Sequence, residues 1–536
     1  MRSTRRGASL LLLLPNNNRA AAAVARSLLS GRRCLSSLHQ SRRSLHLAST
    51  MASSAKTLLS MENLNPNVIE LQYAVRGPLV IRATEIEQEM KKGKKFPFTS
   101  LIKANIGDAH AMGQSPITFI RQTVSAVARP QLLEVKRELF PADVVAKAEA
   151  LLAGMGGRSA GSYTASCGVE KVRQDVVDYI ERRDGGKIKS QPENIMLQGG
   201  ASEAIRAVLK LFSNTTKEGK KAGVMIPIPQ YPLYSASLSE FGLGQVGYYL
   251  DETSNWSLEL AELERSYEEA AKSNWVRAIV VINPGNPTGQ VLTRENVEAI
   301  IRFAQEKRLV LLADEVYQDN VYYGREFHSF KKVMVEMGEP FASMELVSFH
   351  SCSKGYMGEC GLRGGYAELF NVDPEVRAQL YKAISAKLCS TSLGQAAMDC
   401  VVAPPKEGDP SYELFKEEKS STLSSLEKRA SLVHRELNAI EGISCNQVQG
   451  AMYAFPRIHL PPEAIHHAKE VGKEADELWC GELLESTGVL VIPGSGFKQQ
   501  PGTYHFRTTI LPQEAVIKEM LGRIAQFNQK FLEQYK

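Results

Sequence analysis

The chain has 536 residues, of which 43% are hydrophobic and 23% are charged, a balance typical of a globular protein with room for two domains. Its net charge of +5 comes from the N-terminus: residues 1–50 contain nine arginines, no lysine and no acidic residue, so the rest of the chain, at +5 less nine, carries −4. A mildly acidic body argues against nucleic-acid binding, and no stretch has the ~18 uninterrupted apolar residues of a membrane-spanning helix.

The first fifty residues have the composition of an organelle transit peptide. They are rich in Arg, Ser, Ala and Leu, and the first acidic residue of the chain is Glu62. We expect residues 1–50 to be a mitochondrial transit peptide, cleaved near Arg43–Met51, that directs the protein to the mitochondrial matrix. A plastid address is an alternative, and so is a secretory signal, although the apolar run Leu10–Leu14 is short and ends at Pro15.

Eight cysteines are scattered along the chain, with no Cys-x-x-Cys pair and no Cys/His cluster at metal-ligand spacing. This pattern predicts a reducing compartment and no metal site. We expect Cys352 and Cys360 to be packing residues.

Two loops in the N-terminal third each contain one candidate ligand-binding residue. Gly107 lies in a turn at Ala104–Asp108. The glycine either only permits the turn or marks a point at which the backbone comes close to a ligand. Tyr163 lies in a loop before a helix predicted over residues 172–179, and a packed aromatic is the alternative there.

A glycine-rich turn follows the short strand predicted over residues 194–197. It contains Gly200, Ala201 and Ser202 and leads into an apolar helix. Small residues let the backbone approach a ligand, Ser202 can cap the helix, and free N–H groups at a helix N-terminus attract anions. The turn is therefore a candidate phosphate site, although strand–glycine–helix turns are common and no GK[ST] sequence follows.

Buried strands are predicted over Val224–Ile228 and Ala278–Ile282, and each is followed by a candidate site residue. Tyr231 lies near the carboxyl end of the first strand, where open α/β sheets bind ligands, and can stack on a planar ring or pack in the core. Asn286 lies in NPGNPTG after the second strand. Because prolines fix φ and restrict the residues before them, this loop is rigid and presents the asparagine amide.

A third buried strand, predicted over Arg308–Ala313, is followed directly by Asp314 and, three residues later, by Tyr317. A buried carboxylate must be paired, so we expect Asp314 to belong to a site where a charged partner holds it ionised.

The segment Val347–Tyr366, VSFHSCSKGYMGECGLRGGY, contains the central candidate residue, Lys354. An apolar run predicts a strand, which is followed by Ser351, Lys354 and a glycine-rich turn with Arg363. A lysine can form a Schiff base, while serine hydroxyls and a guanidinium bind phosphate. A surface lysine in a polar loop is the alternative for this motif taken alone.

The C-terminal part has mixed character. Residues 373–402 are predicted to be helical, Pro404–Lys419 to be a hinge or exposed insert, and Thr422–Ile440 to be a helix, while Arg507 lies on a short predicted strand. Alternating strands and helices in the middle of the chain predict an α/β fold with a parallel sheet. We expect a large domain at residues 126–400 and a smaller α+β domain. The smaller domain combines residues 51–125, which include an N-terminal arm, with residues 401–536.

Three motifs in this order, NPGNPTG, ADEVYQ and SCSKGYMGECGLRGG, resemble those of the fold-type I pyridoxal-phosphate aminotransferases, the class I and II superfamily. The resemblance covers about residues 60–536. It implies a large cofactor-binding domain with a mostly parallel seven-stranded sheet. Three further segments, Asn65–Gly77, ANIGD and Pro404–Glu418, are similar to those of the alanine aminotransferase branch. They are less specific than the three motifs.

The resemblance also implies a role for each candidate residue. Lys354 is expected to hold pyridoxal 5'-phosphate covalently, Asp314 to pair with its pyridine nitrogen, and Asn286 and Tyr317 to hydrogen-bond its ring oxygen; Lys354, Asp314 and Tyr317 are then the catalytic residues. Tyr231 is expected to stack on the ring, with Ala201, Ser202, Ser351 and Arg363 around the phosphate. Arg507, with Gly107 and Asn286 beside it, is expected to bind the substrate. Tyr163 is expected to reach the phosphate of a neighbouring subunit, which implies a homodimer with shared active sites.

The expected activity is reversible transfer of the amino group between L-alanine and 2-oxoglutarate, with amino acids and 2-oxo acids as the only partners besides a second subunit. Alternatives are a glutamate:glyoxylate aminotransferase and a lyase of the same fold. Glyoxylate-preferring enzymes are usually peroxisomal, and the ending Glu533–Lys536 is not a peroxisomal signal. The fold can also serve as an effector-sensing module of a transcription factor, but such a protein needs an N-terminal DNA-binding domain, and here the expected transit peptide occupies the N-terminus. A non-catalytic homologue is expected to lack Lys354 or Asp314, and this chain has both.

Overall fold

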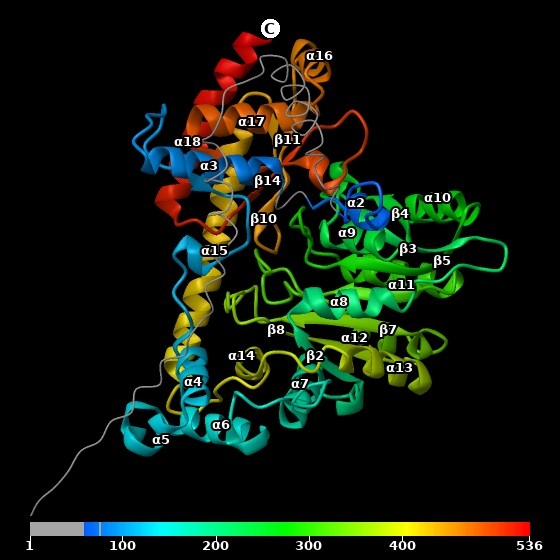
Figure 1. The fold of residues 1–536 in the computed structure, drawn as a ribbon, viewed down its shortest axis with the longest axis vertical. Coiled ribbons are helices and arrows are strands. Elements are labelled where there is room, and N and C mark those ends of the chain that lie inside the picture. Colours follow the sequence, from blue (N-terminus) through cyan, green and yellow to red (C-terminus); the bar gives the residue numbers. More distant parts are fainter. Residues whose placement is uncertain (1–57, 74–76) are drawn as a thin grey trace, which may run out of the picture. The chain divides into compact units, whose positions relative to one another are not determined.

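The structure, a computed structural model, describes residues 58–73 and 77–536. The chain divides into two compact units, Met1–Leu64 and Asn65–Lys536. Residues 58–64 of the first unit form turns, and the expected transit peptide lies outside the described residues. All the helices and strands below belong to the second unit (Figure 1).

A seven-stranded sheet forms the centre of the second unit. The strand order is β2 (Ile195–Gly199), β8 (Gly364–Phe370), β7 (Leu346–Ser351), β6 (Val310–Asp314), β5 (Asn274–Ile282), β3 (Lys221–Ile228) and β4 (Gly244–Tyr249). Neighbouring strands are parallel except at β8, which is antiparallel to β2 and to β7. This confirms the α/β fold with a mostly parallel seven-stranded sheet. Helices cover both faces, which is why the strands are nearly continuous apolar runs.

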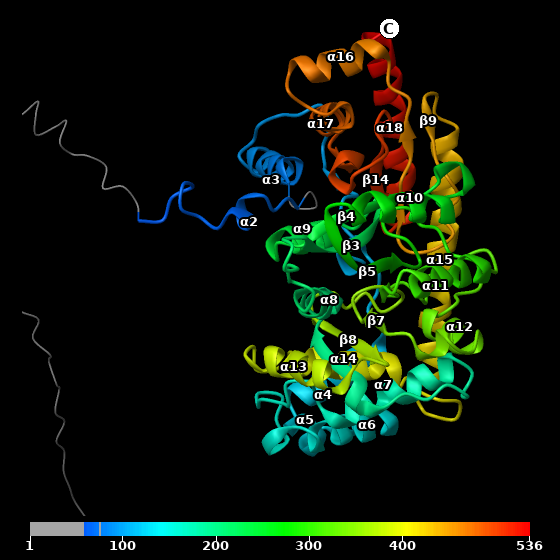
Figure 2. The ribbon, with the colours of Figure 1, turned by 90° about the vertical axis from the view of Figure 1, so that its right-hand side faces the viewer.

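Alternate residues of each strand contact different layers of helices. In β5, Val280 packs with α8 (Ala201–Lys210), α9 (Leu233–Glu240) and α13 (Pro374–Ser385). Its neighbours Ile279 and Val281 pack with α10 (Leu260–Ala271), α11 (Arg294–Glu306) and α12 (Phe330–Glu336). Figure 2 shows these two sets of helices on opposite sides of the strands. The alternation follows from the two-residue repeat of a strand.

A separate group of helices packs around the β2 and β8 end of the sheet. It consists of α4 (Thr118–Ala128), α5 (Gln131–Val135), α6 (Ala142–Ala153), α7 (Glu170–Arg183) and α14 (Ser392–Val402). The helical region expected over residues 373–402 is thus two helices, α13 and α14, which pack in different places.

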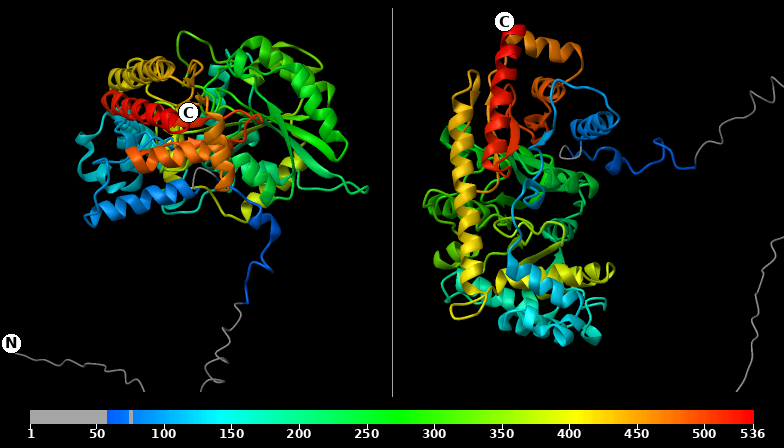
Figure 3. Two further views of the ribbon diagram at one scale, coloured as in Figure 1. Left: turned by 90° about the horizontal axis from the view of Figure 1, so that it is seen from above. Right: turned by 90° about the vertical axis from the view of Figure 1, so that its left-hand side faces the viewer.

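Short strands from both ends of the unit lie beside one another. β1 (Ile102–Lys103) pairs in parallel with β12 (Val489–Leu490). β14 (Phe506–Thr509) lies between β10 (Tyr453–Ala454) and β13 (Ile492–Pro493), and β9 (Ile443–Ser444) pairs with β11 (Arg457–Ile458). The accompanying helices are α2 (Pro66–Ile69), α3 (Pro78–Lys91), α15 (Tyr412–Asn438), α16 (Pro462–Glu470), α17 (Ala475–Thr487) and α18 (Glu514–Gln534) (Figures 1 and 3). None of the described helices is long and apolar enough to cross a membrane.

Helix α15 begins earlier than the sequence pattern predicts. It starts at Tyr412, so the second half of the expected hinge or insert, Pro404–Lys419, is helical. Strong helix formers fill the sequence YELFKEEK at its start. Phe415 also packs edge-on against Phe119 of α4, and Glu418 accepts a hydrogen bond from the Thr118 backbone N–H at 2.9 Å. These contacts lie about 300 positions away in the sequence, beyond any local pattern.

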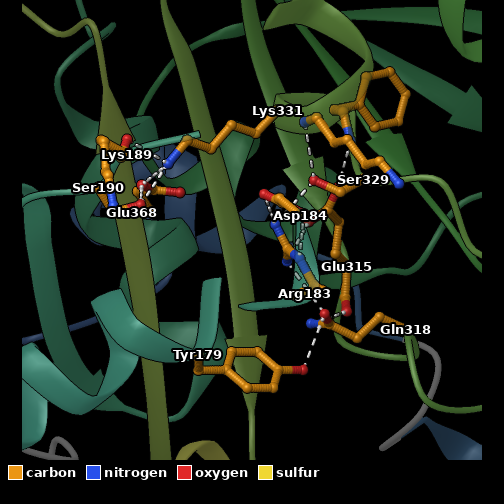
Figure 4. A network of polar contacts seen from close by, with 12 residues as sticks. Tyr179, Arg183, Asp184, Lys189, Ser190, Glu315, Gln318, Ser329, Lys331 and Glu368 are labelled. Carbon is orange, nitrogen blue, oxygen red and sulfur yellow. Dashed lines mark hydrogen bonds and ion pairs between the residues drawn. The ribbon is translucent and has the colours of Figure 1, made fainter. Parts of the chain in front are cut away.

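A buried polar network fixes the chain just after β6 (Figure 4). Glu315 pairs with Arg183 of α7 at 3.4 Å and accepts a hydrogen bond from the Phe330 backbone N–H at 2.9 Å. Arg183 also pairs with Asp184 at 2.8 Å and donates to the Ser329 hydroxyl at 2.9 Å. The network thus joins the end of α7, the start of α12 and the residue after β6.

A second buried pair, Lys331 and Glu368, lies nearby in Figure 4. The two charged atoms are 2.5 Å apart, and neither side chain is exposed. The Lys331 amine also donates to the Ser190 hydroxyl at 2.5 Å. This pair attaches α12 to β8.

We predict that Lys331→Met lowers the free energy of unfolding by about 3–5 kcal/mol, because it leaves the Glu368 carboxylate buried without a partner. Adding Glu368→Leu should recover most of the loss, since both charges are then gone. Lys272→Met is the matched control: its pair with Glu269 is exposed, at 71% and 68%, and its loss should leave the denaturation midpoint unchanged. Equal midpoints for Lys331→Met and Lys272→Met would contradict this account.

Candidate active site

A cavity of about 410 Å³ lies at the carboxyl ends of the parallel strands. The last residues of β5, β6 and β7, which are Ile282, Asp314 and Ser351, all line it. Loops that follow parallel strands meet at one edge of a sheet, and ligands bind there. The structure brings these sequence-predicted residues to the cavity wall: Gly107, Ala201, Ser202, Tyr231, Asn286, Asp314, Tyr317, Ser351, Lys354, Arg363 and Arg507.

Lys354 lies in the loop that follows β7, and its amine donates a hydrogen bond to the Gly107 carbonyl oxygen at 3.0 Å. A Cβ atom at Gly107 would lie 3.0 Å from this amine and would collide with the Tyr453 hydroxyl. Glycine is therefore required at position 107 by the close approach of these two side chains. The carbonyl of the turn and the lysine face the same space.

Asp314 is a buried carboxylate with one free oxygen. Its Oδ2 atom accepts a hydrogen bond from the Tyr234 hydroxyl at 2.9 Å, while the buried Oδ1 atom has no partner. Burial raises the pKa of Asp314 to about 6, although Tyr234, the Val316 backbone and the charge of Lys354 act in the opposite direction. Within the described residues no cationic side chain forms an ion pair with it. The free oxygen is thus available to a cationic donor on a ligand.

The glycine-rich turn before α8 and the residue Arg363 form an anion site. The Arg363 guanidinium donates to the Gly199 carbonyl oxygen at 2.8 Å. Gly200 has φ +84°, and a Cβ there would lie 2.6 Å from the Arg363 Nη2 atom, so glycine is required. The first N–H groups of α8 have no partner inside the helix and attract negative charge.

Ser202 does not cap α8, contrary to the expectation. The N-cap residue is Gly200, and no side chain caps the helix. Ser202 lies in the first turn and lines the cavity. The positive φ of Gly200 starts the helix two residues earlier than the capping pattern predicts, which leaves the serine hydroxyl free for a ligand.

Arg507 of β14 is a buried cation, 1% exposed. Its guanidinium donates to the Asn105 carbonyl oxygen at 2.6 Å and to the Asn286 side-chain oxygen at 3.2 Å, and its Nε atom has no partner. The rings of Tyr453 and Phe497 lie 4.2 Å and 4.6 Å from its central carbon. A buried guanidinium that contacts only neutral groups favours a carboxylate ligand.

Sequence patterns assigned no role to Tyr453, Tyr73 or Tyr234, yet the first two line the cavity and the third contacts Asp314. The Tyr73 and Tyr231 hydroxyl oxygens are 3.2 Å apart. Cys360 also lines the cavity, so it is not only the packing residue that we expected. Cys360 lies in the same segment as Lys354 and Arg363, whereas Tyr73 and Tyr234 contact site residues 158 and 80 positions away, which no local pattern reveals.

Tyr163 does not line the cavity of its own chain. It lies in the loop before α7, and 76% of it is exposed. A large aromatic residue that is this exposed is free to contact another subunit, and its expected role remains a prediction.

The cavity suits one class of ligand. The anion site, the free Asp314 oxygen and the Lys354 amine fit a flat molecule with a phosphate, a basic ring nitrogen and a carbonyl group, and Arg507 fits the carboxylate of a second molecule. In the described part of the chain, no three His, Cys, Asp or Glu side chains are grouped so as to hold a metal ion.

Comparisons with known proteins give one family. A family model described as aminotransferase class I and II matches residues 133–524. Alanine aminotransferase 2 of Xenopus tropicalis is 54% identical over 89% of this chain and 91% of its own length. Alanine aminotransferase 1 of Homo sapiens is also 54% identical, over 89% of this chain and 96% of its own. Probable alanine aminotransferase, mitochondrial, of Dictyostelium discoideum is 46% identical over 90% and 91%.

The fold is similar to that of solved aminotransferases. Alanine aminotransferase from Pyrococcus furiosus aligns with a TM-score of 0.69 over 87% of this chain and 100% of that chain. At 23% identity this similarity shows the fold alone.

We predict that Asp314→Asn changes the pH dependence of stability in the ligand-free protein. The folded pKa of about 6 exceeds the ~3.9 of an unfolded chain, so ionisation destabilises the folded wild type as the pH rises through 6. The unfolding free energy of the wild type, minus that of the variant, should fall by about 2 kcal/mol between pH 4.5 and 7.5. Denaturant titrations at both pH values measure it, and a difference that does not vary with pH would contradict the burial of this charge.

Proposed function

Since the chain belongs to the aminotransferase class I and II family, we propose that it transfers the amino group of L-alanine reversibly to 2-oxoglutarate, giving pyruvate and L-glutamate. The observation that supports this most directly is that a lysine amine, a buried carboxylate with a free oxygen and a buried arginine line one cavity. The identity of about half of all residues to alanine aminotransferases over most of the chain supports alanine as the amino donor.

The proposed cofactor is pyridoxal 5'-phosphate, which supplies an electron sink for the substrate Cα when it is bound. Lys354 would hold it covalently, and the Asp314 Oδ1 atom would accept a hydrogen bond from its ring nitrogen. Tyr231 would stack on the ring, and Asn286 and Tyr317 would hydrogen-bond its ring oxygen. Ala201, Ser202, Ser351 and Arg363 would hold the phosphate.

Asp314 is suited to this role because no cationic side chain of the described residues forms an ion pair with its carboxylate. Burial disfavours its charge, and the Tyr234 hydroxyl that contacts Oδ2 is neutral. A cationic N–H group at Oδ1 would stabilise the ionised carboxylate and lower its pKa. The ionised Asp314 would in turn keep the ring nitrogen protonated.

Lys354 would move the proton. As a free amine beside the bound substrate, Lys354 would take the proton from the substrate Cα as a general base. The resulting Lys354 ammonium would then act as the general acid that gives the proton back. Acid–base catalysis of this kind typically contributes roughly 10²–10⁴-fold.

Arg507 would hold the substrate. A guanidinium binds a carboxylate through two parallel hydrogen bonds, which fixes the orientation of the bonds at Cα. The stacked rings of Tyr453 and Phe497 keep the guanidinium plane in place. Every α-amino acid has this carboxylate, so Arg507 serves both half-reactions.

We further propose a homodimer in the mitochondrial matrix. The exposed Tyr163 supports a contact with the phosphate of a second subunit, because it lies outside its own cavity. Two observations support the mitochondrial location. Residues 1–50 are rich in arginine and contain no acidic residue, and the relative from Dictyostelium is named as mitochondrial.

The first test is the half-reaction. We predict that alanine and glutamate, added singly to the purified cofactor-loaded protein, each change the cofactor absorbance from the aldehyde to the amine form, while aspartate does not. Lys354→Ala is the control and should show no change with any amino acid. If neither alanine nor glutamate changes the absorbance, the proposed substrates are wrong and a lyase activity gains support.

We predict that Arg507→Ala lowers kcat/KM for alanine and for glutamate alike by roughly 10²–10⁴-fold, because each loses two charged hydrogen bonds to its α-carboxylate. Arg435→Ala is the matched control, since its side chain is 66% exposed and outside the cavity wall, and it should behave as wild type. A loss confined to glutamate would show that Arg507 binds the side-chain carboxylate instead.

A further inference from the structure

The structure assigns a positioning role to Tyr453: we propose that its hydroxyl, together with the Gly107 carbonyl, orients the Lys354 amine so that the nitrogen lone pair points into the cavity. This inference rests on the proposed function of Lys354 as the proton-transferring group. It concerns a residue for which neither the motifs nor the family resemblance provided a role.

The position of the Tyr453 side chain carries the inference. The residue is 3% exposed, and its hydroxyl lies against the Gly107 backbone, where a Cβ atom would collide with it. The same Cβ position is 3.0 Å from the Lys354 amine nitrogen. The phenol, the amine and the Gly107 turn therefore meet at one point of the cavity wall.

Two acceptors on the protein constrain the amine. A neutral amine has two N–H groups and one lone pair. One N–H donates to the Gly107 carbonyl oxygen at 3.0 Å. The Tyr453 hydroxyl lies beside the same point of the Gly107 backbone, and in this proposal its oxygen accepts the second N–H. Acceptors on both N–H groups would direct the lone pair to the remaining open side, which is the cavity. An ammonium would hold its third proton on that same side.

The electrostatics agree with an acceptor role for the Tyr453 oxygen. Burial alone would raise the pKa of this phenol, but the positive charges of Lys354 and Arg507 and the nearby Tyr317 hydroxyl outweigh burial and lower it. The neighbouring Tyr317 differs, since burial and Tyr453 raise its pKa well above the ordinary value. Of the two facing phenols, Tyr453 is thus the one whose surroundings favour an acceptor role for its oxygen.

Tyr453 is itself held firmly in place. It lies on β10, which pairs with β14, the strand that carries Arg507. Its ring contacts the Arg507 guanidinium at 4.2 Å on one side and meets the Tyr317 ring edge-on at 6.3 Å. Tyr453→Phe keeps these ring contacts and removes only the hydroxyl, so the variant isolates the proposed interaction.

The test compares proton transfer with substrate binding in the cofactor-loaded full chain. In Tyr453→Phe, exchange of the alanine Cα proton with deuterium oxide, followed by NMR, should slow by about 10-fold or more. The KM for alanine should stay within about twofold, because Arg507 retains its ring contact. Tyr248→Phe is the matched control: its buried hydroxyl donates to the Val280 carbonyl oxygen at 2.7 Å, away from the cavity, and its exchange rate should equal that of wild type.

A second readout does not depend on the amino-acid substrate. The cofactor-free variant should attach added pyridoxal 5'-phosphate to Lys354 about 10-fold more slowly than wild type, measured by absorbance, because the amine is no longer oriented. Slower attachment supports the role of Tyr453 even where wild type fails to exchange alanine, an outcome that would refute only the proposed substrate. Unchanged attachment and exchange rates, a change in KM alone, or an equal effect in Tyr248→Phe would overturn the inference.

Discussion

Two opposite charges are buried in one cavity, and the described part of the chain provides an ion-pair partner for neither of them. Asp314 accepts a hydrogen bond from a neutral hydroxyl and has a free oxygen, and Arg507 donates hydrogen bonds only to two oxygens of neutral groups and has a free Nε atom. Burial of an unpaired charge is unfavourable, which supports the proposal that each group binds a ligand of opposite charge.

The carboxylate that lines the cavity and the one that belongs to the buried polar network are neighbours in the sequence. Asp314 and Glu315 are consecutive, and their side chains lie in different surroundings. Burial raises the pKa of both, to about 6 and about 7 respectively. Glu315, however, has Arg183 and a backbone N–H as partners, whereas Asp314 has a single phenol. The paired residue fixes the chain at the end of β6, and the unpaired one next to it is thereby held in position.

The sequence was sufficient for the sheet and for most of the residues that line the cavity, because both depend on local patterns. Apolar runs predict the strands, and NPGNPTG and the segment around Lys354 directly follow such runs. What could not be predicted depends on distant contacts. Tyr234 lies 80 positions from the carboxylate that it contacts, and Tyr453 reaches Lys354 only because β10 pairs with β14. Likewise, the early start of α15 depends on α4, and the positive φ of Gly200, not a serine cap, sets the start of α8.

The parallel pairing of β1 with β12 affects the order in which the site can be completed during synthesis. A nascent chain that has reached residue 400 contains all seven strands of the central sheet, Lys354 and the anion site, but it lacks β12, β14 and Arg507. Since domains tend to form as the chain emerges, the residues that would hold the cofactor are present well before those that would bind the substrate carboxylate. If the proposed roles hold, acquisition of the cofactor and competence for turnover would be separable in time, and the last strands of the chain would determine when the site becomes active.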